Sequence, residues 1–429
     1  MDTGHTAWIL AAAALVCILI PALALFYGGM VGSRRILNMM MMCFGGVSVV
    51  AVLWALFGYS AVFGNSVGKL GLIGDVTQYP GLDQLLADNP DAPIPVALFA
   101  AFQLLFAGIT TAIIAGAAAG RMKFGAWMLF AGIWSTLVYL PVAHWVFALS
   151  SPDGSVTGGW ILNGIKAIDF AGGTAVHINA GIAALALSLV LGRSAGWPKS
   201  EHVRPHSRPL VLVGAGLLWV GWFGFNAGSA LAAGNSAAVV FLNTAVAGAA
   251  ALLGWIAVER LRLRRASSVG AASGLVAGLV AITPACGAVG PLGAIAIGAI
   301  AGAVCSLAIE WKFRLGFDDS LDVVGVHLVG GVIGTLLIGL FAIEAAPNKT
   351  AGLFYGGGFT LLGTQALATA AVLVYSFVVT WISAKIVQLT VGLRIDPEDE
   401  LRGIDIAAHA EEAYVIDEEP VQLGSPSRT

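Results

Sequence analysis

Charged residues are scarce in this 429-residue sequence, and their scarcity excludes a soluble globular protein. Only 10% of the residues are Asp, Glu, Lys or Arg, whereas a soluble domain carries about 25%. Hydrophobic residues make up 58% of the chain, and the mean hydropathy is +0.88. The composition therefore indicates an all-α integral membrane protein, excludes a soluble enzyme and gives no reason to expect a nucleic-acid partner.

Cysteine is scarce too, and the sequence motifs of common enzymes are missing. The four cysteines all fall in apolar stretches, which favours packed thiols over a disulfide framework. We find no phosphate-binding loop, metal-ligand cluster or nucleophile elbow, so we predict no enzyme activity, no cofactor and no metal. No basic segment and no small-residue cleavage site precede the first apolar stretch, so we expect no removed signal peptide.

What the chain does contain is a series of long runs without any charged residue. A membrane-spanning helix needs about 20 apolar residues, so the runs 209–258 and 266–309 must each hold two helices. We therefore predict eleven transmembrane helices, near residues 7–31, 37–63, 94–119, 125–147, 170–191, 209–232, 236–257, 267–286, 290–309, 325–343 and 359–388.

The distribution of basic residues predicts the orientation of these helices. Short loops on the cytoplasmic side of a membrane retain Lys and Arg. With the N-terminus outside, 18 of the 21 basic residues lie on the inner side, and Lys69, Lys166 and Lys349 remain outside. We therefore predict an outer N-terminus, an inner C-terminus and a multi-pass protein of the cell (plasma) membrane.

An aspartate followed by a histidine occurs once in each half of the chain. Asp169 precedes His177 in the fifth predicted helix, and Asp322 precedes His327 in the tenth. Because the two copies are offset by five helices, an odd number, we predict two inverted repeats of five helices, about 7–191 and 209–343. The eleventh helix, about 359–388, completes a transmembrane domain of residues 1–388, and residues 389–429 form a cytoplasmic tail.

The two histidines are the first functional candidates, because ionisable side chains at membrane depth are costly and usually line an internal path. Taken singly, each histidine could also be a buried polar side chain bonded to a neighbouring helix. His177 lies roughly 12 Å past Asp169, near the middle of the membrane. His327 lies near the cytoplasmic start of its helix, so the two depths match only if the 319–324 segment re-enters or the helix starts earlier, around Phe317.

Five segments carry a resemblance to a known family. They are Pro21–Val31 with Asn38 and Met39, Tyr139–His144, Asp169–Leu185, Leu218–Ser229, and Gly403–Asp405 with His409 and Glu412–Tyr414. In this order the segments resemble the ammonium transporter (Amt/Mep/Rh) family, in its Amt branch. The resemblance implies a homotrimer in which every subunit has its own narrow, mostly apolar pore.

The resemblance also implies a recruitment site for ammonium at the outer mouth of the pore. The matching residues are Phe106, Phe225 and Ser229, with Phe102 in support, and Phe147 stands where the family usually has tryptophan. Ring faces attract an ammonium ion by about 1–2 kcal/mol when it is partly desolvated, and Ser229 can accept one of its N–H bonds. Composition alone would favour ordinary packing for these rings. A second departure from the family is Gly120, where glutamate is frequent.

The expected mechanism follows from the cost of desolvating an ion. An intact ammonium ion crosses an apolar constriction only at a cost of many kcal/mol, so it should lose a proton and cross as ammonia. His177 and His327 would share a proton and offer a relay. Asp169 would hold backbone near the recruitment site, and Asp322 would cap its helix. Net electrogenic transport and a gas channel both remain open.

Three further alternatives concern partners and function. In related transporters a PII-type signal protein docks on the cytoplasmic face, and residues 403–414 match that tail pattern, although an acidic tail could also be simply solvated. Two histidines on facing helices could instead ligate a haem in a membrane redox protein. A sensor that binds ammonium without moving it is the third alternative, although no signalling domain follows the last helix.

Overall fold

The computed structural model describes residues 1–87, 89, 92–195, 197–198 and 204–414. Two basic residues used for the orientation, Lys199 and Arg428, and residues 415–429 of the predicted tail lie outside this part. Within the described residues the fold is helical, with two isolated β-bridges and no β-strand. The predicted all-α architecture is confirmed.

The helices follow one another with short π-helical and 3-10 segments between them. The α-helices are α1 (Thr3–Met30), α2 (Ile36–Leu53), α3 (Tyr59–Phe63), α4 (Val96–Ala118), α5 (Phe124–Trp134), α6 (Leu140–Phe147), α7 (Asn179–Leu191), α8 (Arg208–Gly228), α9 (Asn235–Leu263), α10 (Ser268–Ile282), α11 (Pro291–Ala308), α12 (Trp311–Leu315), α13 (Val329–Phe341), α14 (Thr360–Thr390), α15 (Pro397–Arg402) and α16 (Ile404–His409). The π-helical segments are η1 (Trp54–Gly58), η4 (Ser135–Tyr139), η5 (Ile161–Ile165), η6 (Gly173–Ile178) and η8 (Val324–Leu328), and the 3-10 segments are η2 (Val67–Lys69), η3 (Pro80–Leu85) and η9 (Leu353–Tyr355).

Ten helical segments of the described chain are long and apolar enough to cross a membrane. The helix in the predicted segment 267–286, α10, is apolar but has only 15 residues. A multi-pass membrane protein is therefore confirmed. Eleven crossings, the outer N-terminus and the division into two repeats stay predictions.

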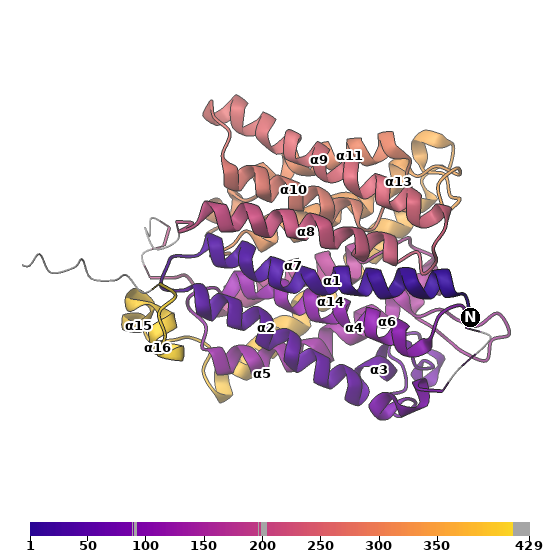
Figure 1. The fold of residues 1–429 in the computed structure, drawn as a ribbon, viewed down its shortest axis with the longest axis horizontal. Helices are drawn as coiled ribbons and strands as arrows, with labels where there is room; N and C mark the ends of the chain where they lie inside the picture. The colour runs from indigo at the N-terminus through magenta and orange to yellow at the C-terminus, as the bar shows by residue number, and fades with distance from the viewer. Residues whose placement is uncertain (88, 90–91, 196, 199–203, 415–429) are drawn as a thin grey trace, which may run out of the picture.

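The helices form one bundle, and different parts of the chain lie at its two ends (Figure 1). The N-terminus lies at one end, and α15 and α16 lie at the other, which we call the tail end. Helix α1 packs along α8, and α9 packs against α10 and α11. At the centre, α7 contacts α4 and α14 and places the fifth predicted segment inside the bundle.

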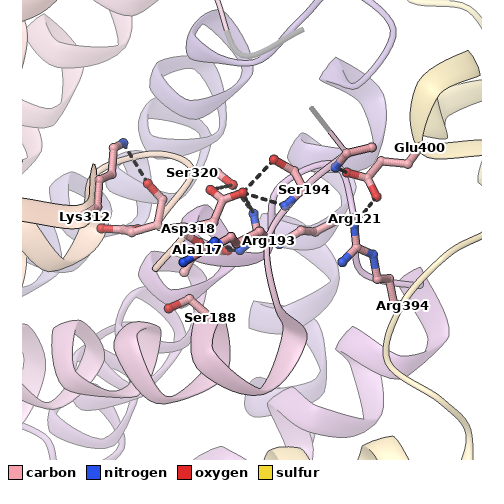
Figure 2. Close-up of polar contacts among 12 residues, drawn as sticks. Ala117, Arg121, Ser188, Arg193, Ser194, Lys312, Asp318, Ser320, Arg394 and Glu400 are labelled. Carbon is pink, nitrogen blue, oxygen red and sulfur yellow. Dashed lines mark hydrogen bonds and ion pairs between the residues drawn. The ribbon is translucent and has the colours of Figure 1, made fainter. Parts of the chain in front are cut away.

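At the tail end, a buried arginine and its ion-pair partner hold three distant loops together (Figure 2). Arg121 is fully buried and forms an ion pair with Asp318, with 3.2 Å between Nη1 and Oδ2. Arg121 also donates to the Ala117 and Asp318 carbonyl oxygens, and Ser194 donates to Asp318 through its backbone N–H and its hydroxyl. These contacts fix the loops after α4, α7 and α12 against one another.

The first part of the predicted tail packs on this end of the bundle. The Glu400 side chain is buried, and its carboxylate accepts hydrogen bonds from Ala195 N (2.7 Å) and Arg394 Nη2 (2.6 Å). The Asp405 carboxylate accepts from the backbone N–H groups of Leu37 and Asn38 at the start of α2. Residues 394–409 are therefore not a freely solvated segment.

The local structure explains why glycine stands at position 120, where the sequence departs from the family pattern. The φ of Gly120 is +73°, which disfavours residues with a side chain. A Cβ at this position would also lie 2.7 Å from Cδ of Arg35. The glycine therefore fits the turn that leads to Arg121.

Replacing Arg121 by alanine should lower the free energy of unfolding by about 3 kcal/mol, because Asp318 would remain buried without its partner. Thermal or denaturant unfolding of the purified protein in detergent measures this change. Arg262→Ala is the matched control, since Arg262 forms an exposed pair with Glu310, and its loss should cost less than about 1 kcal/mol. Equal destabilisation by the two substitutions would contradict the prediction.

Candidate functional site

The structure brings the two predicted histidines into contact at the centre of the bundle. His177 lies in η6 and His327 in η8, and their Nδ1 atoms are 3.3 Å apart. The ring centroids are 5.3 Å apart with an interplanar angle of 31°, and both residues are buried. At this distance the two imidazoles can share one proton, with one ring donating and the other accepting.

The mismatch in depth that the sequence suggested is resolved by a buried loop. Phe317, Asp319, Leu321 and Val323, which precede η8, are all buried. The helix that carries His327 therefore begins inside the protein and not at its surface. This places His327 beside His177 although each lies near the start of its own helix.

A glycine four residues after each histidine lets the two helices cross closely. Segment η6 packs against α13, and η8 packs against α7, so the two histidine-bearing helices run antiparallel. A Cβ on Gly331 would lie 3.2 Å from Cβ of His177, and a Cβ on Gly181 would clash with the backbone of Leu328. Gly181 is therefore needed for this close crossing, and a side chain at Gly331 would press on His177.

Both histidines lie in π-helical turns, which interrupt the ordinary α-helical register. Such turns are rare and occur frequently at functional sites. The start of η6 is held by Asp169, whose carboxylate accepts from the backbone N–H groups of Gly172, Gly173, Thr174 and Ala175 and from the Thr174 hydroxyl. This geometry supports the expected backbone-holding role of Asp169.

The corresponding role in the second half belongs to Asp319 and not to Asp322, which corrects the sequence prediction. Asp319 Oδ2 accepts from the backbone N–H of Val324, the first residue of η8, at 2.6 Å. Asp322 instead forms an ion pair with Lys312 at 2.6 Å, and its φ of +62° turns the chain ahead of the helix. The spacing also identifies Asp319, because both Asp169 and Asp319 lie eight residues before a histidine.

A narrow cavity of about 20 Å³ lies beside the imidazole pair. That volume holds about one water-sized molecule. Apart from the two imidazoles, the lining side chains are aliphatic or aromatic, and they are Leu19, Leu23, Ile109, Ile113, Val176, Leu218, Trp222, Phe225 and Val276. The cavity suits a small neutral molecule better than a hydrated ion.

The aromatic residues predicted for recruitment are partly brought together. The Phe106 and Phe225 rings stack with centroids 4.2 Å apart at 21°, and Phe102 meets Phe106 edge-on at 5.0 Å. Ser229 donates its hydroxyl hydrogen to the Phe225 carbonyl at 2.8 Å. The stacked rings leave no space between them for a molecule, so passage requires at least one ring to move.

Phe147 belongs to no ring pair among the described residues, and no ring contact joins it to Phe106 or Phe225. It is half-buried at the end of α6, and a Cβ on Gly172 would lie 3.7 Å from its Cζ atom. Its position next to the turn that Asp169 holds is compatible with the outer mouth. Its part in a cage with Phe106 and Ser229 stays a prediction.

Sequence reasoning did not find Trp222, which stacks on His177 with ring centroids 5.4 Å apart and an angle of 22°. The indole Nε1–H donates to the Thr283 hydroxyl at 2.8 Å, which fixes the ring. Trp222 lies three residues before Phe225 on α8, so one helix face presents both rings to the cavity. That spacing is the signal in the sequence that could have identified it.

The separation of the histidines argues against a haem between them. A metal bound to both imidazoles needs roughly 2 Å to each nitrogen, with the porphyrin plane between the rings. The Nδ1 atoms are only 3.3 Å apart, and the adjacent cavity is about 20 Å³.

A bundle of long apolar helices around a narrow cavity with a buried imidazole pair defines a membrane channel or transporter. The family model described as Ammonium Transporter Family matches residues 7–414. The chain belongs to this family. Curated ammonium transporters agree over nearly the whole chain, as do solved structures of Amt and Mep proteins.

Two sequence relatives and two structures illustrate the match. An ammonium transporter of Mycobacterium tuberculosis is 55% identical over 437 aligned positions, which cover 96% of this chain and 90% of the relative. One from Corynebacterium glutamicum is 44% identical, covering 99% and 92%. Mep2 of Saccharomyces cerevisiae superposes with a TM-score of 0.83 at 32% identity, covering 93% and 88%. A structure described as Sensor Amt Protein superposes at 0.85 with 29% identity, covering 95% and 98%.

Proposed function

We propose that this protein moves ammonium across the cell membrane by separating it into ammonia and a proton at the His177–His327 pair. The observation that carries the proposal is the 3.3 Å contact between the two Nδ1 atoms beside an otherwise apolar cavity. An ammonium ion has no counter-charge in such a cavity, whereas ammonia can donate to or accept from an imidazole. Ammonia is therefore the species that passes.

Recruitment in this proposal takes place on the far side of the Phe106–Phe225 stack from the histidines. Phe102, Phe106 and Phe225 offer ring faces, and the Ser229 hydroxyl, which now donates to a carbonyl, keeps its lone pairs for an N–H donor. Potassium has no hydrogen to donate to the hydroxyl and no proton to lose at the imidazoles, so it must stay charged. Selectivity thus comes from directional bonding combined with proton loss.

The assembly and the protein partner are proposed from the family resemblance of the sequence. We propose a homotrimer with one pore per subunit in the plasma membrane, and a PII-type signal protein as a partner at the tail end. The packing of α15 and α16 on that end supports a surface of fixed shape. Size determination in detergent and pull-down with a purified PII-type protein test these two proposals.

The transport proposal is tested by comparing cations in reconstituted proteoliposomes. Ammonium addition should give uptake and, if the proton also crosses, a current, whereas an equal concentration of potassium should give at least about 100-fold less. Empty liposomes made from the same lipid are the control. Equal permeation of potassium and ammonium would contradict the deprotonation scheme.

A sensor without transport is the second candidate, because one structural neighbour is named Sensor Amt Protein. Ligand binding without uptake separates this candidate from a transporter. Isothermal titration of the detergent-solubilised protein, run beside the uptake assay, makes the comparison. Saturable binding with no uptake above the empty-liposome control would favour the sensor.

A further inference from the structure

Two aspartates hold equivalent places ahead of the two histidines, but their oxygens are used differently. The five hydrogen bonds that Asp169 accepts occupy the lone pairs of both its oxygens. Asp319 is 1% exposed, and its Oδ2 accepts from Val324 N. Its Oδ1 is buried and has no hydrogen-bond partner within the described part of the chain. Helix capping alone does not account for this second oxygen.

The Asp319 carboxylate lies at the start of the helical segment that carries His327, next to the partly exposed Lys312–Asp322 pair. Its Oδ2 contacts Val324, which is three residues and less than one helical turn before His327. On the other side, Lys312 Nζ donates to the Asp319 carbonyl at 2.9 Å and to Asp322 Oδ1 at 2.6 Å. The Lys312 and Asp322 side chains are 12% and 19% exposed, so Asp319 lies one layer below water.

The surroundings of Asp319 permit it to change protonation near neutral pH. Burial raises the pKa of the Asp319 carboxyl to about 6, against the opposing effect of Lys312. A carboxyl with such a pKa both takes up and releases a proton readily. The charged and titratable groups that face it from the surrounding elements are Lys312, Asp318, Asp322, Arg121 and Tyr27.

We infer that Asp319 accepts the proton that ammonium leaves on the His177–His327 pair and passes it to water at the tail end. An N–H bond of the protonated pair breaks and the pair becomes neutral, while an O–H bond forms on Asp319. The carboxylic acid then releases its proton to water beside Lys312 and Asp322. This inference rests on the proposed function, because it requires ammonium to lose its proton at the histidines.

The test compares the charge moved with the amount of ammonium taken up by the same vesicles. Asp319→Asn keeps an oxygen for the Val324 N–H but cannot take up a proton. In proteoliposomes, the current on ammonium addition and the ammonium accumulated give the charge moved per molecule. This ratio should fall about tenfold in Asp319→Asn and stay near the parent value in Asp319→Glu. Asp322→Asn is the matched control and should keep the parent ratio.

A purely structural role for Asp319 gives a different result. Asp319→Asn would then slow uptake and current together and leave the ratio unchanged, which overturns the inference. If Asp319→Asn does not fold, the parent protein alone suffices. Its ratio should fall when the pH on both sides is lowered from about 7.5 to about 5, because Asp319 then stays protonated. A ratio that is constant over this range also overturns the inference.

The same assay separates this inference from the proposed function. A parent protein that accumulates no ammonium contradicts the proposed function itself. A parent protein that accumulates ammonium without any current leaves transport in place and overturns the role of Asp319. Ammonium uptake with a current that depends on Asp319 supports both.

Discussion

Replacing His177 by alanine is expected to lower the ammonium-dependent current by about 100-fold, the size of effect typical for loss of a proton-transferring side chain. The His177 imidazole contacts His327 at 3.3 Å. Without it, His327 has no neighbouring ring with which to share a proton. The cavity also gains the volume of the lost ring. Solid-supported membrane recordings on reconstituted protein measure the current.

Two further variants make this result specific. The double variant His177→Ala, His327→Ala should lose no more than about twofold beyond the single variant, because residues that act as a unit are not additive. His144→Ala removes another buried histidine, whose Nδ1 lies 2.6 Å from the Val62 carbonyl oxygen, well outside the pair. It should keep most of the current once folding is verified. A His177→Ala variant with the parent current would show that the pair carries no proton.

Replacing Asp169 by alanine should lower the free energy of unfolding by about 4 kcal/mol and abolish uptake. Four backbone N–H groups and one hydroxyl lose their acceptor at the start of η6, and each buried donor left without a partner costs about 1–3 kcal/mol, partly offset by water. Misplacement of η6 also moves His177. Unfolding in detergent and ammonium uptake in proteoliposomes measure the two effects.

Asp322→Ala is the matched control variant for the Asp169→Ala experiment. Its carboxylate contacts Lys312 alone among the side chains described, at a site that water reaches. Its loss should cost about 1–2 kcal/mol and leave uptake largely intact. If Asp169→Ala were no more destabilising than Asp322→Ala, the cluster of hydrogen bonds at η6 would not support the pore.

The helical fold could be predicted because the length of each apolar run can be read from the sequence. Charge-free runs fix where helices lie in a membrane, and all the predicted segments contain helix. The π-helical turns within them could not be predicted, because an extra residue in a turn leaves hydropathy unchanged. The packing of the tail end could not be predicted either. Arg121 and Asp318 are 197 residues apart, and no local sequence pattern indicates that they form a pair.

The candidate site was predicted in part, and the errors have a definite origin. The repeated Asp and His pointed to the pair, but three aspartates occur in the short segment 318–322. Choosing the one nearest to His327 gave Asp322, whereas the repeat of eight residues from aspartate to histidine and four from histidine to glycine identifies Asp319. By the predicted boundaries His327 lay near the start of its helix, and re-entry of residues 319–324 was one of two ways to move it deeper; the residues ahead of the helix are indeed buried.

The sequence does not predict how the aromatic rings of the site contact one another. Phe225 and Ser229 share a helix face by their spacing, but the stack of Phe225 on Phe106 depends on how α4 and α8 pack. The same holds for Trp222, whose orientation is set by Thr283 on a third helix. Family resemblance named most of these residues without giving their contacts.

The antiparallel crossing of the two histidine-bearing helices has a consequence for direction. From either end of this crossing the polar groups occur in the same order along the helices: a helix-capping carboxylate, an imidazole, the second imidazole and the second carboxylate. Polar groups arranged in this palindromic order provide no rectification. In the proposed transport, the crossing would therefore not set the direction of net flow, which would follow the gradient of the substrate.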